Sequence, residues 1–152
     1  MTIGNEAQKE NLALKPLEGF VGEWKSEGTH PYFPEKTFHG RAKFEWIEGG
    51  AFLMIRTEID EPEIPSGISI IGSDDHEGKY YQIYFDERGI SRKYDISIEG
   101  RVMTSSRMTQ EFSQRMVFTL SEDGSTIVAK GEMSREGGAW EGDLELTFTR
   151  VN

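Results

Sequence analysis

Apolar and polar residues alternate along most of the chain. From position 38 to position 46, the even positions hold Phe, Gly, Ala, Phe and Trp, while the odd positions hold His, Arg, Lys and Glu. The same period of two recurs over 90–98, 112–120 and 140–150. Because successive side chains of a β-strand point to opposite faces of a sheet, this pattern predicts strands with one apolar and one polar face.

Short turns that contain glycine separate these runs, as in Glu48-Gly49-Gly50, Glu99-Gly100 and Glu122-Asp123-Gly124. Glycine readily adopts the positive φ that tight hairpins require, so we expect consecutive strands to pair antiparallel. The expected strands are 22–30, 36–47, 51–60, 67–74, 79–86, 89–98, 101–109, 111–120, 126–133 and 139–151.

A single open sheet of this size leaves two unpaired edges and one apolar face without cover. Rolling the sheet closed removes both problems, so the pattern predicts an all-β fold, a single antiparallel up-and-down β-barrel of about ten strands. Pro16 to Val21, followed by Gly22, predict a short helical turn that caps one end. We expect one domain, with a flexible N-terminal tail at 1–15 and the barrel at 16–152.

Closure of such a barrel brings the last strand beside the first. Trp24 lies on the apolar face of the first expected strand, and Arg150 ends the apolar face of the last. An unpaired charge on that face is costly, and a guanidinium stacked over an indole relieves the cost. We therefore predict that Arg150 covers Trp24 and closes the barrel.

The interior of a barrel this wide has room for a ligand. Arg92, Tyr94 and Gln114 share faces with apolar residues, and we predict that they anchor the polar head of a small hydrophobic or amphipathic molecule. Ser26, Thr104 and Ser106 are further polar candidates. The expected apolar walls are Phe44, Trp46, Phe112, Met116, Phe118 and Trp140. The alternative is that these aromatic residues only fill the core and that Arg92 pairs with an internal carboxylate or reaches solvent at a rim.

Charge and composition exclude several partners. The chain has 17 Lys and Arg against 27 Asp and Glu, a formal net charge of −10, and a field of this sign repels nucleic acids and anionic membranes. There is no cysteine, which fits a reducing compartment, and the apolar runs are far shorter than a membrane span. We expect a cytoplasmic monomer or homodimer.

Sequence motifs for catalysis are missing. The chain has no Gly-x-Ser-x-Gly, no His-Glu-x-x-His and no phosphate-binding glycine loop, so we assign no catalytic residue and no metal ligand. The three histidines are His30, His39 and His76. The acidic turn around His76 lacks the spaced oxygen ligands of a calcium loop.

Two resemblances add to this picture. Phe20 to Gly28, Glu45 to Leu53, Ile70 to Asp75, Tyr84 to Arg92 and Trp140 to Arg150 resemble a family of bacterial domains of unknown function with a calycin-like barrel. The Gly-Glu-Trp at 22–24, with the final arginine, resembles the calycin pattern of lipocalins and fatty-acid-binding proteins. The first third is also distantly similar to nitrobindin, which implies haem held by a histidine. The haem-binding histidine of nitrobindin lies later in the nitrobindin chain, and this sequence has no matching histidine there, so we assign no cofactor.

Binding of a small molecule in the interior is the function that these observations favour. An enzyme acting on a hydrophobic small molecule in the same cavity, with His30 or His39 as proton carrier, remains an alternative. Nitrobindin-like haem binding and an empty barrel that acts through its surface are the others.

Overall fold

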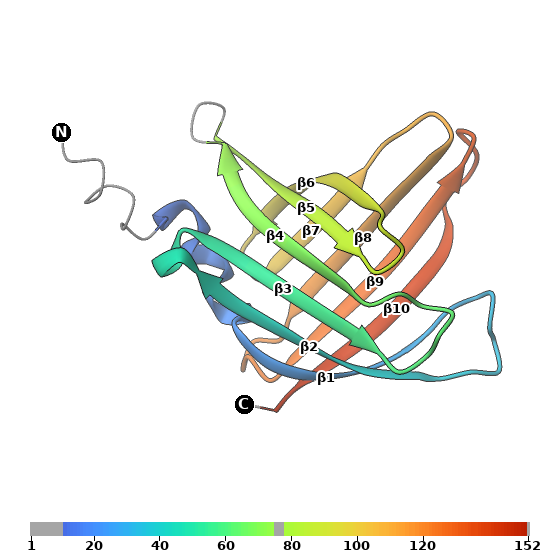
Figure 1. Cartoon of the computed structure of the whole chain (residues 1–152), viewed down its shortest axis with the longest axis horizontal. Helices are drawn as coiled ribbons and strands as arrows, with labels where there is room; N and C mark the ends of the chain where they lie inside the picture. Colours follow the sequence, from blue (N-terminus) through green and yellow to red (C-terminus); the bar gives the residue numbers. More distant parts are fainter. Residues whose placement is uncertain (1–10, 75–77, 152) are drawn as a thin grey trace.

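A computed structural model describes residues 11–74 and 78–151 of the chain, which form a closed antiparallel barrel (Figure 1). Each strand pairs with its neighbours in sequence and β10 pairs with β1, as the period of two predicted. The strands are β1 (Gly22–Thr29), β2 (Phe38–Ile47), β3 (Phe52–Ile59), β4 (Gly67–Asp74), β5 (Lys79–Asp86), β6 (Ser91–Glu99), β7 (Val102–Arg107), β8 (Phe112–Leu120), β9 (Thr126–Arg135) and β10 (Glu141–Arg150).

A 3-10 helix, η1 (Leu12–Phe20), closes one end of the barrel. Leu14, Leu17 and Phe20 are 0%, 0% and 1% exposed. Their spacing of three matches the three residues per turn of a 3-10 helix, so all three side chains point into the barrel. A second short helix, η2 (Glu48–Gly50), connects β2 to β3.

The helix begins earlier than we predicted from Pro16. Asn11 caps it by accepting a hydrogen bond from the Ala13 N–H at 3.1 Å, and the Asn11 amide donates to Ser73 Oγ at 2.9 Å. The burial of Leu14 then holds this first turn against the barrel. Residues 11–15 are therefore ordered parts of the fold rather than tail, and positions 1–10 of the expected tail lie outside the described residues.

The seam between β1 and β10 is held by the predicted pair. Trp24 lies directly opposite Arg150, and the guanidinium carbon lies 4.2 Å from the centroid of the indole ring. Arg150 also donates to three backbone carbonyls, those of Gly19, Val21 and Gly124, at 2.8, 2.7 and 2.9 Å. One side chain thus joins the helix, the start of β1, the turn between β8 and β9, and the last strand.

The two ends of the barrel differ. At the end that carries η1, large apolar side chains pack together, and Trp24 donates its Nε1–H to the Phe20 carbonyl at 3.0 Å. The opposite end is bordered by the β1–β2, β3–β4, β5–β6, β7–β8 and β9–β10 connections (Figure 1). No helix among the described residues is long and apolar enough to cross a membrane.

Candidate functional site

A cavity of about 520 Å³ occupies the barrel interior toward the end away from η1. Its mouth is formed by the β1–β2 and β3–β4 connections, and its lining includes no residue of η1. The volume lies within the range of sites for small molecules. Its apolar wall consists mainly of Phe44, Ile55, Met116, Phe118, Leu144, Leu146 and Phe148.

Six of the predicted site residues line this cavity: Arg92, Tyr94, Gln114, Phe44, Met116 and Phe118. Phe112 is outside the lining, and so is Trp46. It lies two positions beyond Phe44 on β2, which runs toward η1, and it packs against the core at the closed end. Trp46 therefore contributes to packing around the cavity floor rather than to the lining.

A bulge in β10 changes which residues face inward. The register shifts between Gly142 and Glu145, and opposed residues share a face of the sheet. As a result Asp143, which the alternation placed outside, lines the cavity together with Leu144.

The same bulge moves Trp140 away from the interior, where we had expected it. The Arg115 guanidinium carbon lies 3.8 Å from the centroid of the Trp140 ring. Arg115 also donates a hydrogen bond to Glu132 at 2.9 Å. Trp140 therefore stacks on Arg115 and is itself absent from the cavity lining.

The polar side of the cavity is a connected chain of hydrogen bonds. Arg92 Nη1 and the Tyr94 hydroxyl both donate to Gln114 Oε1, each at 3.2 Å. Gln114 Nε2 donates to Asp143 Oδ2 at 3.2 Å, and His30 Nε2 lies 2.9 Å from Asp143 Oδ1. Residues from β6, β8, β10 and the β1–β2 connection thus meet at one place.

Both ring nitrogens of His30 are engaged. Its Nδ1 accepts the Tyr32 backbone N–H at 3.0 Å, so the ring proton is on Nε2 and is donated to Asp143. An imidazole in this state has no free nitrogen for a haem iron or for abstracting a proton. His39 is exposed on the outer face of β2, and His76 lies outside the described residues. The histidines described therefore do not fit the haem alternative.

Arg92 differs from the other two arginines that line the cavity. Arg88 contacts Asp86 at 2.7 Å, and Arg115 contacts Glu132 at 2.9 Å. Among the described residues, Arg92 makes no ion pair and has only the neutral Gln114 amide as a side-chain acceptor. The site therefore has a half-buried cation whose charge no directly contacting carboxylate neutralises.

A second polar cluster lies on another wall of the cavity. Ser105 Oγ donates to Gln82 Oε1 at 2.6 Å, and Gln82 Nε2 donates to Ser69 Oγ at 2.7 Å. Ser105 and Met103 are the buried residues of β7, so the inward face of this strand is the odd-numbered one and not that of Thr104 and Ser106. Ser26 is buried as expected, at 6% exposure.

Tyr84 adds a neutral hydroxyl to the lining. Burial, and then a hydrogen bond from its hydroxyl to Asp86 at 2.8 Å, raise the pKa of Tyr84 well above the ordinary value. A hydrogen bond from Arg88 is the main reason that the pKa of Asp86 is far below its usual range. Tyr84 therefore remains a phenol, with its ring edge-on to Tyr94 at a centroid distance of 6.2 Å.

An ionic link crosses the mouth. Lys36, from the β1–β2 connection, contacts Glu61 at 3.2 Å and Glu63 at 3.1 Å in the β3–β4 connection. The Lys36 ammonium also lies 5.7 Å from the Phe33 ring centroid. The Glu61 side chain and then Lys36 lower the pKa of Glu63 to about 2. The two connections that border the cavity are thus joined to each other.

Comparison with known proteins gives a family. Residues 11–150 match the family described as "Protein of unknown function (DUF1579)", which is nearly the whole chain. This chain belongs to the DUF1579 family. No curated protein sequence matches this DUF1579 member.

A solved structure supports the fold. The crystal structure of Rv2717c from M. tuberculosis is similar with a TM-score of 0.67 and 15% sequence identity, over 95% of this chain and 100% of that one. At this identity the similarity concerns the fold alone. The chemistry of the DUF1579 barrel must be argued from its own residues, and those described include no group of three or more acidic or histidine side chains able to hold a metal ion.

Proposed function

We propose that this protein binds a small amphipathic molecule with an anionic head, such as a carboxylate, inside its barrel. The observation that carries the proposal is Arg92, the one cavity arginine among the described residues without an ion-pair partner. The head would contact Arg92, and the apolar part would lie along Phe44, Phe118 and Phe148. A calycin-type relationship and a cytoplasmic location belong to the same proposal, supported by the Trp24–Arg150 seam and the lack of cysteine.

The hydrogen-bond geometry suits a carboxylate. Arg92 and Tyr94 both donate to a single oxygen of Gln114, at 3.2 Å each, which is long for such bonds. A carboxylate has two charged oxygens and accepts from a guanidinium in a bidentate manner, which is a stronger interaction than with a neutral amide. A bound carboxylate would replace a weak acceptor by a strong one.

Binding is better supported than catalysis. A base or a haem ligand needs a free imidazole nitrogen, whereas His30 uses both of its nitrogens in contacts with Tyr32 and Asp143. These contacts position the polar wall instead. They orient Asp143, which in turn accepts from the Gln114 amide and fixes the acceptor of Arg92.

Calorimetric titration with three probes that share one alkyl tail tests this function. We expect dodecanoate to bind more tightly than dodecanol, and dodecyltrimethylammonium to bind least. Arg92→Leu should weaken dodecanoate binding by about 10- to 100-fold, the range for a hydrogen bond to a charged group, with little effect on dodecanol. The dodecanoate affinity of Arg92→Lys should lie between those of the wild type and of Arg92→Leu.

Arg41→Leu is the matched control, because Arg41 lies on the outer face of β2 and pairs with Glu58. It should leave all three affinities unchanged. Equal affinity for the three probes, or equal losses in the two Arg→Leu variants, would refute the proposal. Native mass spectrometry of protein purified without detergent is an independent check, and copurified haem with a Soret band would favour the haem alternative instead.

A further inference from the structure

The second polar cluster of the cavity has hydrogens that no described acceptor takes. It consists of Ser69 on β4, Gln82 on β5 and Ser105 on β7, and we call it the Ser–Gln cluster. All three residues line the cavity, and the two serines are each 6% exposed. Gln82 donates one of its two amide hydrogens to Ser69 Oγ and accepts from Ser105 Oγ. The Ser69 hydroxyl hydrogen and the second Gln82 amide hydrogen have no acceptor among the described residues.

The number of these spare hydrogens does not depend on which way the Gln82 amide is turned. With the amide reversed, Ser69 donates to the amide oxygen and the amide nitrogen donates to Ser105. The hydroxyl hydrogen of Ser105 then replaces that of Ser69, and one amide hydrogen again remains. The Ser–Gln cluster therefore presents two donors to the cavity in either arrangement, and buried donors normally find an acceptor.

The Ser–Gln cluster lies deeper in the barrel than Arg92. Arg92 pairs with Tyr84 across β5 and β6, whereas Gln82 pairs with Tyr94. Gln82 is thus two residues farther from the mouth than the residue opposite Arg92, which is about 7 Å along the strands. When the head of a ligand contacts Arg92, the middle of its tail is therefore at the level of the cluster.

The wall across the barrel from the Ser–Gln cluster is apolar. Phe44 and Phe148 come from β2 and β10, which lie opposite β7 and β5 in the ring of strands. A plain alkyl tail suits that wall. It would also cover the two donors of the cluster without accepting from them, which is unfavourable for buried polar groups.

We propose that the ligand carries a carbonyl oxygen in the middle of its tail, which accepts from the Ser–Gln cluster. This inference rests on the proposed function, because the head at Arg92 sets the position of the tail. A carbonyl oxygen has two lone pairs and no hydrogen, so it matches two donors better than a hydroxyl does, whereas a methylene accepts nothing. The ligand class is therefore an oxo-substituted amphiphilic carboxylate rather than a saturated fatty acid.

Calorimetric titration of the wild type with a series of oxododecanoates, in which the ketone moves along the tail, tests the proposal. We expect a mid-chain isomer to bind about tenfold more tightly than dodecanoate, and isomers with the ketone beside the head or near the far end to show no such advantage. The hydroxy acid with its oxygen at the best position should lie between that ketone and dodecanoate. Equal affinities along the series, or weaker binding than dodecanoate at every position, would overturn the proposal.

A variant with an apolar cluster locates the effect. The triple variant Ser69→Ala, Gln82→Leu and Ser105→Ala has no spare donor, so the preference for the ketone should disappear while dodecanoate still binds. Ser26→Ala is the matched control, because Ser26 is also 6% exposed but does not line the cavity, and it should keep the preference. Melting temperatures show whether each variant is folded. A folded triple variant that still prefers the ketone would overturn the assignment to the Ser–Gln cluster.

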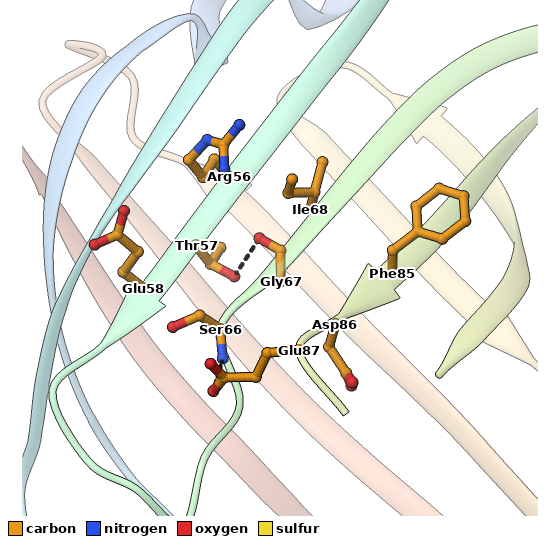
Figure 2. A pocket seen from close by; sticks show the side chains of 9 residues that line it. All are labelled: Arg56, Thr57, Glu58, Ser66, Gly67, Ile68, Phe85, Asp86 and Glu87. Carbon is orange, nitrogen blue, oxygen red and sulfur yellow. Dashed lines mark hydrogen bonds between the residues drawn. The ribbon is translucent and has the colours of Figure 1, made fainter. Parts of the chain in front are cut away.

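Binding at the outer surface has its own control. A hollow of about 420 Å³ lies on the outside of the barrel, with Arg56 in its lining. Figure 2 shows Arg56, Ile68 and Phe85 around it on three neighbouring strands. Arg56 does not line the interior cavity, so Arg56→Leu should leave the preference for the ketone unchanged. Loss of the preference in this variant would overturn the interior site.

Failure of this inference and failure of the proposed function give different results. The effect of the head is measured by comparing each acid with the alcohol of the same chain, and the effect of the ketone by comparing chains that share a head. A carboxylate advantage without a ketone advantage overturns this inference and leaves the proposed function standing. A ketone advantage without a carboxylate advantage refutes the anionic head and leaves the Ser–Gln cluster as a carbonyl site.

Discussion

The closed end and the open end of this barrel are built from the same alternating strands, yet they have opposite properties. At the closed end, η1 inserts Leu14, Leu17 and Phe20 among the inward side chains, and each is at most 1% exposed. At the open end the same inward positions surround a cavity of about 520 Å³ with polar groups on one side. Alternation decides which side chains point inward, and the segments outside the alternation decide whether the interior is filled.

This difference separates stability from binding. The closed end buries apolar surface, and burial of apolar surface is the main source of folding free energy. In the described part of the chain, no buried side-chain nitrogen or oxygen lacks a hydrogen-bond partner. The open end keeps Arg92 half-buried beside a neutral partner, an arrangement that contributes little to folding. Substitutions at the two ends should therefore affect different measurements.

The largest expected effect is at the closed end. Leu17→Ala should lower the free energy of unfolding by about 3 kcal/mol, because it removes a fully buried side chain and leaves a void. Phe118→Ala, on the cavity wall, should cost less although it deletes more atoms, since Phe118 is only partly buried and already borders open space. Urea denaturation of both variants measures this, and equal losses would contradict the comparison.

The next largest loss of stability is expected at the seam between β1 and β10. Arg150→Met should lower the free energy of unfolding by about 2 kcal/mol, because the carbonyls of Gly19, Val21 and Gly124 lose their donor. Arg150→Lys should recover only part of this loss, since an ammonium cannot reproduce the planar fork that serves all three while stacking on Trp24. Thermal denaturation followed by near-ultraviolet circular dichroism, which reports on the packing of the aromatic side chains, measures the change. A lysine variant as stable as the wild type would show that only the charge matters.

At the open end, Asp143→Asn should have a smaller effect on stability, about 1 kcal/mol, because the two hydrogen bonds that the carboxylate accepts, from Gln114 and His30, lose their charged acceptor. It should also tighten dodecanoate binding a few-fold, since a negative charge next to the anion site is removed. Calorimetric titration measures the change. Weaker binding in Asp143→Asn would mean that the orientation of Gln114 matters more than the charge.

The smallest effect concerns the mouth and pH. The pKa of Glu63 is lowered from 4.5 to about 2. The stabilisation that the ionised Glu63 carboxylate gives to the mouth is therefore fully present above the ordinary pKa, and it is lost as the pH falls through about 2. The link from Lys36 should therefore persist under mildly acidic conditions. Hydrogen exchange of the two connections, corrected for intrinsic rates, should stay constant from about pH 7 to about pH 5. Lys36→Met should increase that exchange at both pH values. Faster exchange in the wild type at about pH 5 than at about pH 7 would contradict the lowered pKa of Glu63.

Much of the fold could be predicted from the sequence because it depends on local patterns. The period of two and the glycine turns predicted the strands and their antiparallel order, and a closed barrel is the arrangement that leaves no edge. The Trp24–Arg150 contact could also be predicted, since closure forces the ends of the two strands together. Arg92, Tyr94 and Gln114 were placed in the interior because they share faces with apolar residues, and in the structure they contact one another.

Other features depend on events that alternation does not encode. The bulge in β10 turned Asp143 inward and Trp140 outward, and nothing short of the observed register reveals it. Strand β5 has large aromatic or apolar residues at both even and odd positions, and in β4 the outward positions Ile68 and Ile70 are more apolar than the inward Ser69, so the sequence did not assign Gln82 to the interior or Phe85 to the exterior.

The place of Arg150 at the end of β10 has a consequence for synthesis. Its three carbonyl partners and Trp24 all precede it in the chain, so the ring of strands cannot close until β10 has been made. Until then β1 and β9 remain unpaired margins that other growing chains could join. Pairing of β10 with both β9 and β1, which Arg150 secures at the seam, therefore covers both margins in one step.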